Sequence, residues 1–325
     1  MGTVVPAIPT ELMAQSEVDR NETSSVAIPE TIRSLRGPPT RSPQMKIPIK
    51  SSLALLFSLA LASAEQETQG ADLKFVAAVS AIQPGVPFTV ALHIRHEEGF
   101  HTYWKAPGIV GLPTMIEWKL PPGFSAGPIE WPSPELVDMA SHPAHGYHRD
   151  VLLLTKITPP QTIETKSVML VGDLTWMACR KTCHPGFALR KITIPITKNA
   201  QAKPHHRWAP AIAKERANLP GPSAPWTVTV ESKQDATPIK VRLRPAKGAS
   251  PDPGNVYFFS ADGQLTSEPP QKFARQKDGS YLITGLRSEF APERKSTLPG
   301  ILVASKGWSA KGKLSAFQVA PPFPK

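Results

Sequence analysis

Cys179 and Cys183, four positions apart, are the only two cysteines in this 325-residue chain. The flanking segments, residues 167–176 and 187–196, are apolar and β-prone, and the second alternates apolar and polar residues like a strand with one buried face. A hairpin with a three-residue loop at 180–182 would place the cysteines opposite each other, with Cβ atoms about 4.5–5.5 Å apart. A disulfide needs about 3.5–4.5 Å, so the pair can open and close with little backbone movement.

Three chemical uses of this pair are open: redox exchange, a structural staple and a metal site. In the chain-entropy model, closing a loop of about 5 residues stabilises by only ~2 kcal/mol, so a staple contributes little. Arg180 and Lys181 lie between the sulfurs and would stabilise a thiolate, the species that attacks a disulfide. Spacing and charge therefore favour redox use, and they leave open which cysteine attacks and which resolves.

The start of the chain predicts export. Residues 45–64 combine a basic start, an apolar run at 53–61 and an A-x-A cleavage site at 62–64, as a signal peptide does. The apolar run is shorter than the roughly 20 residues that span a bilayer. Residues 1–44 are polar and aperiodic, which indicates an unstructured leader or a mis-assigned start. The mature chain is expected to begin near Glu65 in a disulfide-permissive compartment.

The formal net charge of +11 raises the question of nucleic acid binding. Export and the lack of a basic run count against that class of partner. We interpret the charge as a solvated basic surface of the protein, which favours an acidic partner or the surface of the membrane.

Short apolar runs separated by Pro/Gly turns, with almost no helical period, predict an all-β fold. Residues 65–200 are expected to form an antiparallel, immunoglobulin-like β-sandwich, with a polar loop at 133–150. Residues 201–225 are expected to form a linker with a short helix, followed by a second small β-sandwich at 226–325. The Pro/Gly-rich end of the linker predicts that residues 65–200 fold independently. The expected strands lie near residues 73–77, 88–94, 114–118, 129–132, 151–157, 226–230, 239–243, 256–259, 281–283 and 300–304.

Several motifs occur in the order typical of one protein family: His101-Thr102-Tyr103-Trp104-Lys105, Pro107-Gly108, Gly111-Leu112-Pro113, Ile129-Glu130-Trp131-Pro132, Gly146-Tyr147, Val151-Leu152-Leu153 and Cys183-His184-Pro185-Gly186. Through them, residues 72–197 resemble the N-terminal periplasmic domain of the DsbD and ScsB thiol:disulfide interchange proteins. Residues 288–292 and 298–300 resemble the region that follows in ScsB-like members.

The resemblance implies a periplasmic protein whose cysteine pair accepts electrons from a membrane-embedded relay and reduces disulfides of exported proteins. The expected partners are thiol- or disulfide-containing exported proteins and a DsbD-like membrane donor acting in trans, without nucleic acid and without a cofactor. DsbD has more residues between its cysteines than this chain, and an aromatic cap over them. Here the corresponding loop, residues 141–145, has no aromatic residue before Tyr147, which becomes the candidate shield.

Copper binding is the alternative function for the same residues. Soft thiolates, thioethers and imidazoles suit Cu(I), Cys-x3-Cys also occurs in Sco-type copper proteins, and ScsB-like proteins are associated with copper tolerance. The candidate ligands are Cys179, Cys183, His184 and Met177. His184 is also a candidate for stabilising a thiolate, and His142, His145 and His148 cluster in the loop expected near the cysteines. A non-catalytic adaptor with a structural disulfide is a third possibility.

Overall fold

The computed structural model describes residues 69–197, 202–293, 295–310 and 314–324. The leader and signal peptide expected over residues 1–64 lie outside these residues. The described residues belong to one compact unit, Ala64–Lys325. Within them, no helix is long and apolar enough to cross a membrane.

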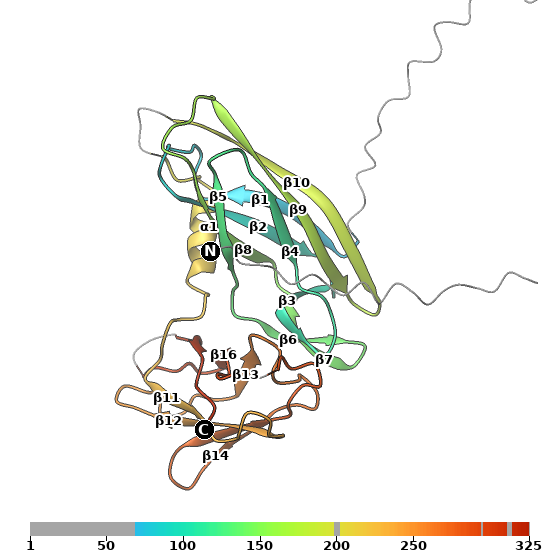
Figure 1. Ribbon diagram of the computed structural model, residues 1–325, viewed down its shortest axis with the longest axis vertical. Coiled ribbons are helices and arrows are strands. Elements are labelled where there is room, and N and C mark those ends of the chain that lie inside the picture. Colours follow the sequence, from blue (N-terminus) through green and yellow to red (C-terminus); the bar gives the residue numbers. More distant parts are fainter. Residues whose placement is uncertain (1–68, 198–201, 294, 311–313, 325) are drawn as a thin grey trace, which may run out of the picture. The chain divides into compact units, whose positions relative to one another are not determined.

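The first half of this unit is an antiparallel β-sandwich, which confirms the predicted fold class (Figure 1). One sheet has the order β1-β2-β8-β5, and the other has the order β10-β9-β3-β7-β6, with β4 also paired to β9. The strands of the first sheet are β1 (Ala71–Ala77), β2 (Phe88–His96), β8 (Val151–Thr158) and β5 (Ser125–Glu130). Those of the second are β10 (Cys183–Pro195), β9 (Ser167–Cys179), β3 (His101–Gly108), β7 (His142–Tyr147), β6 (Glu135–Met139) and β4 (Met115–Lys119).

The period-two pattern of β9 decides which way the cysteines face. Leu170, Leu174 and Trp176 are buried in the main core, whose wall also includes Trp104. Successive side chains of a strand point to opposite faces, so Cys179, an odd number of residues from these, faces away from that core. It lies instead in a separate small apolar cluster on the outer face of the sheet.

Residues 133–150, expected to be a polar loop, instead contain the hairpin β6–β7, which pairs with β3 through β7. Its turn residues Ala140 and Ser141 have φ of 48° and 77°, the backbone of a tight hairpin turn, although neither is a residue typical of such turns. Gly146 permits the pairing with β3, because a Cβ at this position would lie 2.2 Å from the Thr102 carbonyl oxygen. Sequence reasoning missed the hairpin because its signals are tertiary contacts rather than local pattern.

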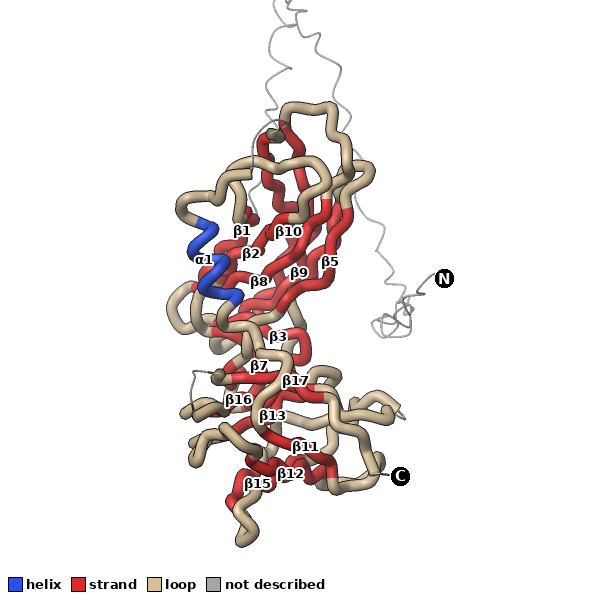
Figure 2. The backbone as a smooth tube through the Cα atoms, turned by 90° about the vertical axis from the view of Figure 1, so that its left-hand side faces the viewer, coloured by secondary structure: helices blue, strands red, loops and turns tan. Residues whose placement is uncertain are grey.

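The predicted short helix is present as α1 (Trp208–Arg216), beside the sheet that contains β1 and β8 (Figure 2). Ile212 anchors it by packing with Val76 and Leu152. The second block consists of two small sheets, with orders β11-β12-β15-β14 and β13-β16-β17. Their strands are β11 (Trp226–Val230), β12 (Ile239–Pro245), β13 (Val256–Ser260), β14 (Lys272–Arg275), β15 (Tyr281–Gly285), β16 (Gly300–Ala304) and β17 (Ala316–Val319).

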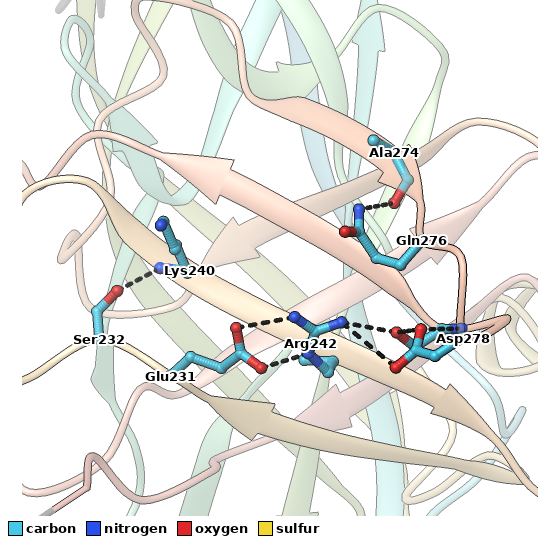
Figure 3. Close-up of polar contacts among 8 residues, drawn as sticks. Glu231, Ser232, Lys240, Arg242, Ala274, Gln276 and Asp278 are labelled. Carbon is cyan, nitrogen blue, oxygen red and sulfur yellow. Dashed lines mark hydrogen bonds and ion pairs between the residues drawn. The ribbon is translucent and has the colours of Figure 1, made fainter.

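Arg242 ties three segments of the second block together (Figure 3). Its guanidinium makes a two-point ion pair with Glu231 and donates to Ser280 Oγ at 2.7 Å, with Asp278 3.9 Å away. The hydrogen bonds from Arg242 lower the pKa of the Glu231 carboxyl. The network fixes β12 against the loop before it and the turn between β14 and β15.

The two blocks are joined by apolar contacts. Phe259, Ile301 and Ala316 of the second block belong to the same buried cluster as the core of the first sandwich. The ring of Phe259 meets that of Trp104 edge to face, with centroids 6.2 Å apart. The second block thus packs directly on β3, the strand whose first residue, His101, pairs with Cys179.

Candidate functional site

The cysteine pair closes the end of the long β9–β10 hairpin. Cys179 and Cys183 are direct partners in the antiparallel register, as the sequence predicts. They form a disulfide with their Cα atoms 4.2 Å apart. The loop between them is held by a hydrogen bond from the Arg180 N–H to the Thr182 carbonyl at 3.1 Å.

The two sulfurs differ in accessibility. Cys179 is 0% exposed and packs with Tyr103, Val137 and Ala144. Cys183 is only partly buried. Cys183 is therefore the more exposed residue of the disulfide.

Two side chains contact the accessible sulfur. The Met139 Sδ lies 3.6 Å from Cys183 Sγ and comes from the end of β6. The Tyr103 hydroxyl lies 3.9 Å from the same sulfur. Burial raises the pKa of Tyr103 to about 12, so the phenol keeps its proton at neutral pH and can donate to a thiolate. We call the β6–β7 hairpin (residues 135–147), which carries Met139 over the disulfide, the cap hairpin.

The charged residues between the cysteines, Arg180 and Lys181, are exposed, and the Arg180 side chain lies against Gly99. His184 points to the opposite face of β10 from Cys183, since adjacent residues alternate. Its Nε2 is 2.9 Å from Thr182 Oγ1, and its ring faces Phe100.

Tyr147, the candidate shield, is also directed elsewhere. It belongs to the main core, and its hydroxyl donates to the Pro132 carbonyl at 2.7 Å. Met139 and Tyr103 occupy the place expected for it. Met177, by contrast, lies beside the cysteines, packed on the cluster that contains Cys179.

His101 is a neighbour of the pair that sequence reasoning did not single out. It is the register partner of Cys179 across β3 and β9, so both side chains are on the same face. It is 1% exposed, and among the described residues its Nε2 has no hydrogen-bond partner. Burial, with His148 and His96 nearby, lowers its pKa to about 4. In the motif His101-Thr102-Tyr103-Trp104-Lys105, His101 and Tyr103 alternate and so lie on the same face of the strand. This alternation is the sequence signal that could have identified His101.

The three loop histidines do not converge on the sulfurs. His142 pairs with Glu268, and His145 is buried against Ala106 and Tyr257. His148 lies beside His101, with ring centroids 5.3 Å apart. Among the residues that the structure describes, no group of three or more His, Cys, Asp or Glu side chains is arranged to hold a metal ion.

Buried histidines make the stability of the fold sensitive to acid. Burial lowers the pKa of both His101 and His145 to about 4, below their ordinary 6.5. Between pH 4 and pH 6.5 the unfolded chain therefore binds more protons than the folded protein. The contribution of these histidines to the free energy of unfolding is complete above pH 6.5 and is lost as the pH drops toward 4. We expect urea unfolding to show a loss of at least about 1 kcal/mol between pH 7.5 and pH 5. His145→Gln should flatten the dependence, whereas exposed His206→Gln should leave it unchanged; equal slopes for both would contradict this account.

Comparisons with known proteins show what this chain is similar to in sequence and in fold. A family model described as "Thiol:disulfide interchange protein DsbD, N-terminal" matches residues 72–192. The N-terminal periplasmic domain of ScsB from Proteus mirabilis has a TM-score of 0.55 and 16% identity, and the match covers 80% of this chain and 96% of that one. The full-length major pilin SpaD from Corynebacterium diphtheriae matches with 11% identity over 77% of this chain and 59% of that one. Its TM-score of 0.25 is too low to support an inference. No curated protein matches the chain.

The matched region contains β1 to β9 and most of β10, and hence the disulfide, Tyr103 and the cap hairpin. The ScsB likeness extends the shared fold over the second block as well. Residues 72–192 of this protein are therefore similar in sequence to the DsbD N-terminal family of thiol:disulfide interchange proteins.

Proposed function

We propose that this protein is a periplasmic thiol-disulfide interchange protein that passes electrons through Cys179 and Cys183 between a membrane-embedded donor and exported proteins. The observation that supports this most is the asymmetry of the disulfide, with Cys183 accessible and Cys179 fully buried. Arg180 and Lys181 add positive charge at the loop that an anionic thiolate approaches.

The exchange proceeds in two displacements. A donor thiolate attacks Cys183 Sγ, the Cys179–Cys183 bond breaks, and its electron pair leaves on Cys179 Sγ as a thiolate. A second donor thiolate then attacks the donor sulfur of this mixed disulfide and releases Cys183 as a thiolate, to which the Tyr103 hydroxyl can donate. The donor leaves oxidised, and the protein has gained two electrons and, from solvent, two protons. The same steps in reverse reduce a disulfide of an exported protein.

The reduction potential of the purified protein tests this function. An exchange pair must lie within reach of thioredoxin-like donors, so we expect a potential above about −300 mV in equilibration with glutathione or a dithiol. A value well below that, with no reduction by a thioredoxin-like protein, would mean a structural staple and would contradict the proposal.

Copper(I) binding is a second candidate function, supported by the thioether of Met139, which contacts Cys183, and that of Met177, which packs on the cluster that contains Cys179. The two thiolates of the reduced pair and these thioethers are the soft donors that Cu(I) prefers, whereas His184, on the opposite face, does not fit the set. Repeating the potential measurement with Cu(I) separates the two functions. A copper protein should bind Cu(I) only when reduced, and its potential should then shift. An unchanged potential would exclude this candidate.

A further inference from the structure

The second block contacts the turn of the cap hairpin. The Nδ1 of His142 donates a hydrogen bond to Glu268 Oε2 at 2.7 Å, and the two residues are 126 positions apart in the sequence. These side chains are 54% and 39% exposed, so this hydrogen bond can break in water without disturbing a core. His142 lies across the two-residue turn from Met139, its register partner, whose thioether contacts Cys183. The hydrogen bond from His142 to Glu268 therefore fixes the end of the hairpin that lies over Cys183.

A second contact fixes the segment after β3. The Ile109 N–H donates to the Ser267 Oγ at 3.1 Å, and Ser267 is 1% exposed. A few residues on, Pro113 makes a parallel bridge with Tyr103, the other side chain that contacts Cys183. Neighbouring residues of the second block, Ser267 and Glu268, thus reach both segments that surround this sulfur.

The base of the cap hairpin is held differently, by buried groups. His145 Nδ1 lies 3.0 Å from the Ala106 carbonyl, which can only accept, so Nδ1 carries the proton. His145 Nε2 then accepts from the Tyr257 hydroxyl at 3.2 Å, and the ring also packs against Phe259. Because the base is buried and the turn is held by an exposed hydrogen bond, the turn is the part that can open.

We propose that Glu268 and Ser267 are positioning residues that hold the cap hairpin over Cys183, so that the second block controls the access of thiols to the disulfide. They act through Met139 and Tyr103 and touch neither sulfur themselves. The physiological meaning of this control rests on the proposed exchange function. Whether the second block controls access can be tested without that function, because access can be measured with a small reductant.

The test is the second-order rate constant for reduction of the disulfide of the full chain by dithiothreitol. A solvent-exposed contact between two polar side chains is weak, so Glu268→Ala should raise this rate by roughly two- to fivefold. Asp252→Ala, which removes the comparably exposed ion pair with Lys306 elsewhere in the second block, is the matched control and should leave the rate unchanged. Thermal unfolding midpoints equal to that of the parent protein exclude a general loss of structure.

A double-mutant comparison tests whether Glu268 acts through the cap. Met139→Ala alone should raise the rate at least as much, and adding Glu268→Ala to it should then have little further effect, because the covering thioether is already gone. Ser267→Ala should raise the rate in either background, because it acts through the segment near Tyr103. Rates unchanged by Glu268→Ala, or an undiminished effect of Glu268→Ala in the Met139→Ala background, would overturn the proposal. A failure of exchange with proteins, in contrast, would leave these small-reductant rates as they are and would count against the proposed function alone.

Discussion

Cys179→Ser should trap partner proteins as mixed disulfides, and Cys183→Ser should not. In the first variant the accessible Cys183 thiol still attacks, but the resolving thiol is gone and the intermediate cannot collapse. In the second, the remaining Cys179 is 0% exposed and packed under Tyr103 and Val137, so it does not reach a partner. We expect the difference to be nearly all-or-none on non-reducing gels of periplasmic extract, with bands that disappear on adding dithiothreitol.

Stability provides the control for this experiment. Loss of the disulfide should cost each variant no more than ~2 kcal/mol, because the closed loop is small. Both variants should therefore remain folded in urea titrations. Equal trapping by both would contradict the assignment of Cys183 as the attacked sulfur. No trapping, together with outright unfolding of both, would show that the bridge is structural.

Trp176→Ala should be among the most destabilising single changes in the first sandwich. The side chain is 2% exposed in the main core, three residues before Cys179 on the same strand. Its ring lies against Gly186, its register partner on β10, where an added Cβ would be 2.2 Å from the ring. Removing so large a buried side chain leaves a cavity beside the hairpin and typically costs about 3–5 kcal/mol. Urea unfolding at pH 7.5 measures the loss.

Trp176→Phe is the matched comparison. Phenylalanine refills much of the volume and removes an indole N–H that is buried without a partner among the described residues. It should therefore cost clearly less than the alanine variant. Trp118→Ala, which removes a partly buried ring stacked on Phe75 at 4.6 Å, should also cost less. Similar losses for all three variants would mean that Trp176 does not anchor the hairpin.

Local pattern in the sequence determined the fold class and the disulfide hairpin. Apolar and polar residues alternate along β9 and β10, and this local pattern predicts the two strands. The three-residue loop between the strands predicts that Cys179 and Cys183 lie opposite each other. The strands of the second block were predicted in a similar way, from short apolar runs separated by turn residues.

Only the tertiary structure decided what surrounds the sulfurs. The cap hairpin has no turn signal of its own and forms because β7 finds a partner in β3. Its existence places Met139, rather than Tyr147, at Cys183, and strand alternation turns His184 away. The contacts of Ser267 and Glu268 join positions more than 120 residues apart, and no local periodicity encodes such pairs. The asymmetry between a buried Cys179 and an accessible Cys183 is likewise a property of packing, because the sequence treats the two cysteines alike.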